Sequence, residues 1–398
     1  MKQLLYLIYL MVLASLAGSC DINQKDVSPE EEFVKIFNHP DEQLRFFPQS
    51  VEESDQGGFI ILSGVKSDTA ENEFPSSYLI GTDKQGKLIW NDENNYLAPE
   101  GRLLKKDDGM SYVAMDNQFN GVGLDIDVNT GQVIRQVPLD LKMPLFSYVS
   151  SRGDFLVLGH DFINRASKIS LFSKDFDPLR KASLNINTDL QNIVQKHLNK
   201  SGKQYPFFIG EFLDNPDAGF FVNCFSNYSL RIVFLDQGGN LLPGDIYSFQ
   251  TEAAVSSFVQ QEESRFSLTR YYGGNNYLIP EINVQPGISQ NFNNIDALSL
   301  FELSPDAAVK SLKVTIDDAK SILFASHTNS NSLIIYQYNM ETDEEISVYM
   351  QDFNNKIEIA DMIQAKDEAI VVLGKIFVLG KYPRPLLVKI PANEFSAE

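Results

Sequence analysis

One pattern of apolar and polar positions recurs along the chain from Phe33 onward. Each copy has an apolar run after an acidic or glycine turn, then a polar gap, a second apolar run, an Asp/Gly turn and a third run. The clearest copy occupies 56–64 and 77–90. Continuous apolar runs between turn residues are typical of strands buried on both faces. The turn at 83–86 can close a hairpin, because glycine tolerates positive φ and aspartate bonds to its own backbone.

Further copies follow at intervals of roughly 40 to 60 residues, which is near the period of blade-forming repeats. Their first apolar runs open at 108–114, 153–159, 218–222, 265–268, 332–336 and 368–374. One antiparallel unit cannot bury both of its faces, whereas units stacked in a ring can, and a ring leaves only short edges. We therefore predict an all-β chain with a single β-propeller over 33–395.

The copies favour seven blades. Six or eight blades stay open as alternatives, because the fifth and sixth copies are blurred. We expect the first strand, at 33–37, to complete the last blade and close the ring. Two stacked sandwich domains are the alternative architecture.

A short helical insertion is predicted between the third and fourth copies, at about 188–201. Thr188 and Gln191 have the spacing of a capping box. Apolar residues from Leu190 onward recur on one helix face, and Gly202 can end the helix. A plug packed on a blade edge and a lid over a ligand are both compatible with this helix. Long loops on a rigid ring are where binding residues gather, and two more insertions lie at 66–76 and 281–294.

Two of the copies, at 82–90 and 124–134, resemble the repeats of quinoprotein-like and related bacterial propellers. In those repeats a strand ends in aspartate, the next turn ends in glycine, and a strand often ends in tryptophan. The resemblance implies a propeller shape over most of the chain. A quinoprotein dehydrogenase would be expected to have a tryptophan in most blades, but Trp90 is the only tryptophan here. We therefore expect no cofactor, and a shared fold alone does not fix the function.

The start of the chain has the layout of an export signal. A lysine precedes an almost wholly apolar stretch at 4–17, and small residues follow it, which is typical of a signal peptide removed from the mature protein. The stretch is shorter than the roughly 20 residues that a membrane-spanning helix needs. We assign 1–19 to the signal peptide, 20–32 to a tether and 33–395 to the propeller.

Cys20, at the first mature position, resembles the lipid-attachment site of bacterial lipoproteins. That family usually has leucine three residues before the cysteine, where this chain has Ala17, with Leu16 one position further back. The resemblance implies several acyl chains on Cys20, and stable anchoring takes more than one chain. An acidic stretch after the cysteine resembles the surface-export signals of Bacteroidetes lipoproteins. We therefore expect attachment to the cell envelope at the outer membrane, with an ordinary secreted protein as the alternative.

The net charge of −20 narrows the range of partners. An acidic surface repels phosphate backbones, so a nucleic-acid partner is not expected. Anionic headgroups would repel it too, so we expect the membrane to be bound through the lipid on Cys20. The second cysteine, Cys224, lies in an apolar run and is predicted to be a buried, inert thiol. We expect a monomer that binds an envelope protein or a glycan.

No catalytic residue and no metal ligand is assigned. The four histidines are not at zinc spacing, and the chain has no H-E-x-x-H, G-x-S-x-G or phosphate loop. Asp125 and Asp127 alternate as calcium ligands do. An EF-type loop, however, needs glycine where Thr130 stands and glutamate where Gln136 stands. We therefore interpret 125–131 as a plain hairpin.

The candidate binding residues are Arg270, Tyr271 and Tyr272. Tyrosine offers an apolar ring with a hydroxyl and arginine adds a fixed fork of donors, a combination common at binding hot spots. Ordinary strand packing before the turn at 273–274 is the alternative interpretation.

Three functions are compatible with these patterns. The favoured one is an envelope-anchored ligand-binding, protein-binding or scaffold propeller, because no catalytic motif is present. The second is a polysaccharide hydrolase or lyase, which predicts His160 or two carboxylates about 5 to 9 Å apart at the channel mouth. The third is an assembly role, which predicts a flat apolar patch of more than a few hundred Å².

Overall fold

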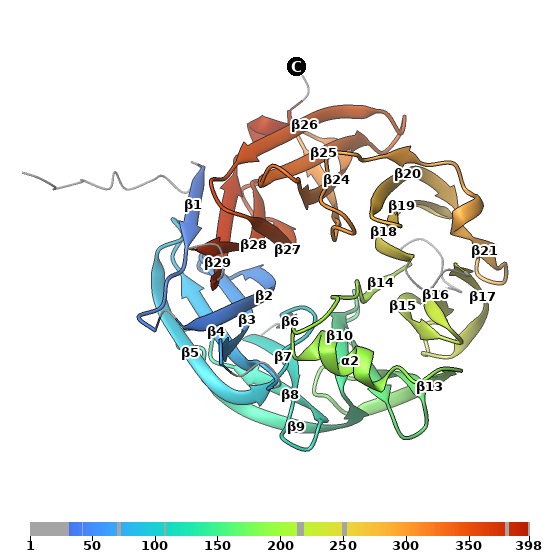
Figure 1. Cartoon of the computed structure of the whole chain (residues 1–398), viewed down its shortest axis with the longest axis horizontal. Helices are drawn as coiled ribbons and strands as arrows, with labels where there is room; N and C mark the ends of the chain where they lie inside the picture. The colour runs from blue at the N-terminus through green and yellow to red at the C-terminus, as the bar shows by residue number, and fades with distance from the viewer. Residues whose placement is uncertain are drawn as a thin grey trace, which may run out of the picture.

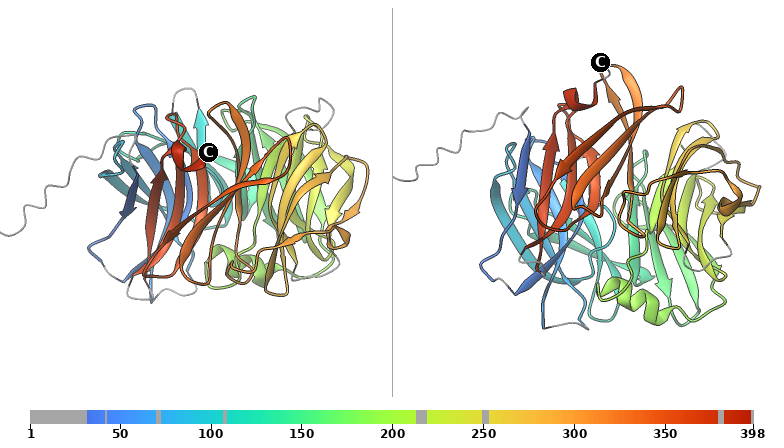
Figure 2. Two further views of the ribbon diagram at one scale, coloured as in Figure 1. Left: turned by 90° about the horizontal axis from the view of Figure 1, so that it is seen from above. Right: turned by 45° about the horizontal axis from the view of Figure 1, so that its top comes forward.

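The computed structural model describes residues 32–41, 43–69, 73–106, 109–212, 219–248, 253–378 and 382–396. The predicted signal peptide at 1–19, Cys20 and the tether up to residue 31 lie outside the described residues. In the described part the β-strands form one ring (Figure 1). From the side, the strands run from one face of the ring to the other, and helix α2 (Gln191–Leu198) lies at one face (Figure 2).

Strand pairing among the described residues forms six sheets. The first contains β2 (Leu44–Glu53), β3 (Phe59–Ser67), β4 (Ser76–Thr82), β5 (Leu88–Leu97), β7 (Gly109–Met115), β8 (Asn120–Ile126) and β9 (Val133–Lys142), with β6 (Leu104–Lys106) beside β7. The second contains β10 (Pro144–Val149), β11 (Phe155–Asp161), β12 (Ala166–Phe172) and β13 (Pro178–Asn185). The third contains β14 (Phe208–Glu211), β15 (Phe220–Ser226), β16 (Ser229–Leu235), β17 (Leu241–Tyr247) and the parallel β21 (Gln290–Asn291).

Three more sheets complete the ring. The fourth contains β18 (Ala254–Glu262), β19 (Arg265–Tyr272), β20 (Asn275–Asn283) and β22 (Leu298–Ser299). The fifth contains β23 (Lys310–Ile316), β24 (Ala319–His327), β25 (Ser332–Asn339) and β26 (Glu345–Asp352). The sixth contains β27 (Ile357–Gln364), β28 (Ile370–Val378), β29 (Tyr382–Ile390) and β1 (Phe33–Ile36). Two 3₁₀ turns are η1 (Phe292–Asn294) and η2 (Ala392–Phe395).

The predicted seven blades are not matched by seven separate sheets, because strand pairing gives one sheet fewer in the described part. The first two sequence copies share a sheet through a single paired position, Leu97 with Met115. Strand β6 covers only positions 109–111 of β7, which leaves the end of β7 open to β5. On either side of this junction, β2–β5 and β6–β9 each form an antiparallel unit.

The first strand closes the ring, and this prediction is confirmed. β1 pairs antiparallel with β29, from Phe33 opposite Lys389 to Ile36 opposite Leu386. The two ends of the described chain therefore share one sheet, as Figure 1 shows. A single closed ring excludes the alternative of two stacked sandwich domains.

The core lies between neighbouring sheets, because the middle strands are buried on both faces. Strands β3, β11 and β15 are buried along almost their whole length, whereas the outer strand β5 alternates exposed and half-buried positions. Cys224 on β15 is fully buried, which confirms that prediction. Burial raises the pKa of its thiol to about 12, so the thiol is unreactive at neutral pH.

The predicted helix forms, but its start differs from the prediction. It begins at Gln191 with Leu190 as the N-cap and has no side-chain cap. Instead of Thr188, Asp189 approaches the helix start, where its Oδ1 accepts a hydrogen bond of 3.0 Å from the Gln191 N–H. The buried residues are Val194, His197 and Leu198. None of the helices in the described ranges is long and apolar enough to span a bilayer.

Candidate ligand-binding channel

A cavity of about 360 Å³ lies where the first strands of the sheets meet the insertion that carries α2. Its lining includes residues of β2, β10, β23 and β27, the loop before β6, and the stretch after α2. We name it the channel cavity. A second cavity of about 180 Å³ shares Gln49, Phe146 and Lys310 with it and continues along β14 and β18. The two cavities therefore adjoin along the inside of the ring.

A buried ion pair holds the end of the α2 insertion against the ring. Lys200 pairs with the Glu100 carboxylate, and their side chains are 6% and 5% exposed. Burial raises the pKa of Glu100, and Lys200 opposes that rise. Lys66 Nζ adds a hydrogen bond of 2.6 Å to the Asn199 carbonyl oxygen. With Val194 and Leu198 packed in the core, the helix is fixed in place as a packed plug would be.

A second set of charges lines the channel cavity on the side of β27 and β28. Glu358 accepts ion pairs of 2.7 Å from both Lys375 and Lys356. Burial opposes ionisation of Glu358, but the two lysines outweigh it and lower the pKa of Glu358 to about 2. Lys375 is mostly buried, whereas Lys356 is more than half exposed. Glu358 is therefore a fixed anion at neutral pH.

A third set of charges includes Arg102 and Asp361, which line the smaller cavity. Arg102 donates to Asp361 at 3.2 Å, and the other oxygen of Asp361 accepts a hydrogen bond of 3.2 Å from the Val51 backbone N–H. Glu52 follows Val51 on β2 and, unlike Asp361, forms no ion pair with Arg102 in the described part of the chain. Burial, only partly offset by Arg102, raises the pKa of Glu52 to about 7. Glu52 lines neither of the two channel cavities described above.

Three hydrogen-bond donors that line the channel cavity have no partner in the described part of the chain. Lys310 Nζ makes no hydrogen bond or ion pair, and Tyr271 Oη and His197 Nε2 are buried without a hydrogen bond. His197 Nδ1 accepts from the Tyr205 backbone N–H at 3.0 Å, so the ring proton is on Nε2. Burial and nearby Lys200 hold the pKa of His197 well below its ordinary value.

The three predicted binding residues are not brought together. Tyr271 lines the channel cavity, is 2% exposed and has Lys203 Nζ at 4.6 Å from its ring centre. Arg270 donates to the carbonyl oxygens of Phe292 and, at 3.3 Å, Ile295, so it holds the η1 turn. Tyr272 is 42% exposed and lies outside the cavity. Neighbouring residues on a strand point to opposite faces, which is why only Tyr271 faces the cavity.

His160 and the turn at 125–131, both considered as functional sites from the sequence, do not line the channel cavity. His160 on β11 is 2% exposed and lines none of the described cavities, so it is not at the channel mouth. The segment 125–131 is a hairpin turn, in which the Gly131 N–H donates to the Asp127 carbonyl oxygen at 2.7 Å. Asp125 pairs with Lys106 and Arg135. Within the described ranges, no three or more His, Cys, Asp or Glu side chains group so that they could hold a metal ion.

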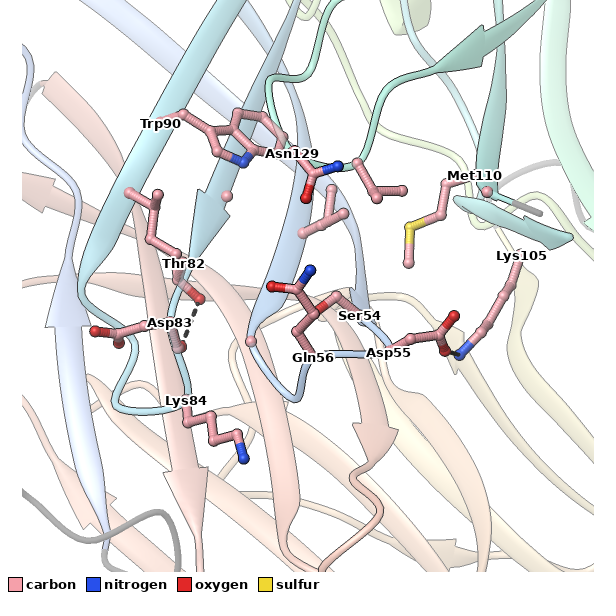
Figure 3. A pocket seen from close by; sticks show the side chains of 16 residues that line it. Ser54, Asp55, Gln56, Thr82, Asp83, Lys84, Trp90, Lys105, Met110 and Asn129 are labelled. Carbon is pink, nitrogen blue, oxygen red and sulfur yellow. Dashed lines mark hydrogen bonds and ion pairs between the residues drawn. The ribbon is translucent and has the colours of Figure 1, made fainter. Parts of the chain in front are cut away.

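A separate cavity of about 510 Å³ lies between the first two sequence copies. Figure 3 shows Trp90, Gln56 and Asn129 around it, with Lys105 beside Asp55 on one side. The Lys105–Asp55 ion pair is 3.0 Å long and the Asp55 side chain is 79% exposed. We name this space the Trp90 cavity. It begins beyond the end of β2, whereas the channel cavity is lined by the start of β2.

Sequence reasoning missed most of the channel charges. Glu100, Lys200, Lys310 and Lys375 come from four different stretches of the chain, and none belongs to a recognisable motif. A signal was present at Lys310, a lysine that begins an inner strand directly after an apolar stretch. Side chains alternate between the two faces along a strand, so this signal marks Lys310 as a candidate without showing that it faces the channel.

No family model and no curated protein sequence matches this chain. Among solved structures, it is similar to the WD40 β-propeller domain of Doa1, with a TM-score of 0.51 and 8% identity over 90% of this chain and 95% of that one. It is also similar to the Dos1 propeller, with a TM-score of 0.48 and 11% identity over 86% of this chain and 81% of that one. At these identities, the likeness to the Doa1 domain concerns the fold alone, and together with the strand pairing it shows that the chain folds as a single β-propeller.

Proposed function

We propose that this protein is a binding propeller of the bacterial cell envelope, anchored by lipid on Cys20, whose ligand or partner enters the channel cavity. One observation carries the proposal: buried donors without partners face one concave space on a rigid ring. Cavities of roughly 300 to 1,000 Å³ with a few convergent polar groups are typical recognition sites. Function belongs to such a site and not to the fold itself.

Binding is favoured over catalysis because the carboxylates around the channel cavity are already neutralised. Glu100 is held by Lys200, and Glu358 is held by Lys375. A glycosidase needs one carboxylic acid and one carboxylate free to act on a sugar. Carboxylates held in ion pairs can help to position a ligand, but they are not free to transfer a proton to it.

The alternative function is a polysaccharide hydrolase or lyase. The raised pKa of Glu52 favours it, but the position of Glu52 does not, because this residue lines neither of the two channel cavities. A carboxyl group with a pKa of about 7 has the value that suits a general acid at neutral pH. Polysaccharide cleavage, measured as new reducing ends or unsaturated products, decides between the two. Cleavage that is lost in Glu52→Gln would establish the enzyme and overturn the binding-only function.

We further propose that the eight-stranded sheet contains two blades, which makes seven blades in the ring. The support is that β2–β5 and β6–β9 are each antiparallel and share only the Leu97–Met115 position. Leu97→Pro removes the backbone N–H of Leu97, the residue at that junction. We expect the two units to keep separate hydrogen-exchange protection in this variant, whereas a coupled loss of protection across both units would indicate one continuous sheet.

The anchor is tested by changing Cys20. In Cys20→Ala, lipid attachment is impossible, and the protein is expected in the soluble fraction of the envelope instead of the membrane fraction. Globomycin, which blocks lipoprotein signal cleavage, is expected to cause the uncleaved form to accumulate. A Cys20→Ala protein that stayed in the membrane fraction would contradict lipid anchoring.

Binding at the channel cavity is tested on a glycan array and by pull-down from envelope extracts. Tyr271→Phe removes one unpartnered hydroxyl, and Tyr272→Phe is the matched control because Tyr272 is exposed outside the cavity. A specific ligand is expected to be retained by the control and weakened by Tyr271→Phe. Binding that ignores Tyr271→Phe but is lost in Trp90→Phe would place the site in the Trp90 cavity.

A further inference from the structure

Among the charged side chains that line the channel cavity, Lys310 stands apart because it has no ion-pair partner in the described part of the chain. Every other ionised side chain that lines it has an oppositely charged partner within 4 Å; the pairs are Lys200–Glu100, Lys375–Glu358, Lys203–Asp306 and Arg45–Asp68. Lys310 has none among the described residues. Glu358 holds a second lysine, Lys356, but that side chain is 58% exposed, so water and salt screen its charge. Lys310 is therefore the one lysine or arginine side chain of the cavity that has no ion-pair partner in the described ranges. Burial lowers the pKa of Lys310, and Asp361 and Glu100 oppose this only from beyond ion-pair distance.

Among the described residues, two uncharged side chains of the cavity also lack an acceptor, while Asp306 Oδ1, which lines the same cavity, is a buried acceptor without a hydrogen-bond donor. Tyr271 Oη can donate a hydrogen bond, and His197 Nε2 carries a proton that it does not share, since Glu100 is 4.0 Å away. Both side chains are more than nine-tenths buried and both line the cavity. A buried donor without a partner costs about 1 to 3 kcal/mol. A ligand that supplies acceptors would remove this cost at both positions.

We infer that the channel cavity binds a carboxylate group, with Lys310 as its ion-pair partner and Tyr271 and His197 as hydrogen-bond donors. This inference rests on the proposed binding function and names the chemistry of its ligand. A free organic acid, an acidic sugar and a peptide C-terminus all present this group. The protein carries a net charge of −20, so an anion is drawn to this place by the local charge and not by the surface as a whole.

Charge balance favours a carboxylate over a phosphate. A carboxylate is a monoanion and neutralises the one unpaired lysine. A phosphate monoester carries about −1.5 to −2 at pH 7, which would leave a surplus negative charge beside Glu100 and Glu358. Burying an unpaired charge is strongly unfavourable. Lys310 also lines the adjoining smaller cavity, so the bound group lies where the two cavities meet.

The experiment is an NMR titration of the full-length protein labelled with ¹³C-lysine. The probes are galacturonate, its neutral counterpart galactose, an acetylated dipeptide with a free C-terminus, the same dipeptide amidated, and inorganic phosphate. Lys310→Gln identifies the Lys310 signal by its loss, and Lys320→Gln is the matched control, because Lys320 is exposed on the same sheet. Calorimetry on the same proteins gives the affinities.

We expect at least one of the two carboxylates to shift the Lys310 signal and raise the pKa of Lys310, while its neutral counterpart does neither. Lys310→Gln is expected to weaken that binding about 30-fold or more, Tyr271→Phe about tenfold, and Lys320→Gln not at all. Whichever carboxylate binds identifies the source of the group.

Three results would overturn the inference, and they are distinguishable. Equal binding of a carboxylate and its neutral counterpart, unchanged in Lys310→Gln but weakened in Tyr271→Phe, would keep the binding site and remove the anion. Tighter binding of phosphate than of either carboxylate would keep the binding site but show that its ligand is a phosphate and not a carboxylate. If no probe moves any signal of a residue that lines the channel cavity, the inference fails. The proposed function fails separately if glycan or protein ligands found by array or pull-down ignore Tyr271→Phe.

Discussion

The channel cavity and the Trp90 cavity differ in the state of their polar groups more than in their size. The Trp90 cavity is larger, about 510 Å³ against about 360 Å³, but its charges are exposed and locally bonded. Asp83 accepts from the backbone N–H groups of Gln85 and Lys87, and Asp55 pairs with Lys105 at the surface. The channel cavity instead holds buried donors without partners. The volume of a cavity therefore does not identify the recognition site, whereas buried hydrogen-bond donors without partners do.

The largest expected effect comes from breaking the ion pair at the channel cavity. Lys200→Met leaves Glu100 buried without its partner, and losing one member of a buried pair costs about 3 to 5 kcal/mol of unfolding free energy. Because burial raises the pKa of Glu100, this loss is expected to shrink as the pH falls and the carboxyl group takes up a proton. Urea unfolding at pH 5 and pH 8 measures both effects.

The matched change at the Trp90 cavity is Lys105→Met. Its partner Asp55 is largely exposed, and exposed pairs contribute little because water screens them. The free energy of unfolding is expected to stay close to that of the unchanged protein. Equal losses in Lys200→Met and Lys105→Met would contradict the difference between the two cavities.

The next effect concerns the helix at the channel cavity, which has no counterpart at the Trp90 cavity. Leu198 is fully buried in the core, while Ile193 on the same helix is 36% exposed. Leu198→Ala is expected to cost about 3 kcal/mol through a lost core contact and the space it leaves. Ile193→Ala is expected to cost less than about 1 kcal/mol. Similar losses in thermal or urea unfolding would show that the helix is not packed as described.

A smaller effect, with a defined pH dependence, is expected at Glu52, which lies on β2 between the two cavities. Its folded-state pKa of about 7 is above the ordinary value of 4.5, so the folded state binds the proton more tightly than the unfolded state. This group therefore supports stability below about pH 4.5, and that support is lost as the pH rises through 7. Glu52→Gln is expected to stabilise the protein by about 2 kcal/mol at pH 8 and to change it little at pH 4. A gain of equal size at both pH values would contradict this assignment.

The ring could be predicted from the sequence because its signals are local and repeated. Apolar runs such as 59–64 and turns such as 83–86 lie within one unit, and the predicted strand at 33–37 did close the ring. The number of separate sheets could not be predicted, because it depends on the single paired position of Leu97 and Met115. The helix start was wrong because Asp189 bonds to the Gln191 N–H where Thr188 was expected to cap.

The chemistry of the candidate site was largely invisible in the sequence because its partners are far apart in the chain. Arg102 and Asp361 are separated by 259 positions, and Lys200 and Glu100 by 100. Only the closed ring brings them together. Tyr271 was predicted as a binding residue and does line the channel cavity. Its neighbours Arg270 and Tyr272 do not, because strand geometry turns them to the other face.

One titration compares the two cavities within a single sample. Trp90 is the only tryptophan in the chain, so its indole N–H signal reports on the Trp90 cavity alone, while Lys310 reports on the channel cavity. With galacturonate or the free-acid dipeptide added, the account predicts that the Lys310 signal shifts in a saturable way and the Trp90 signal stays in place. A saturable shift of Trp90 with Lys310 unmoved would contradict the account.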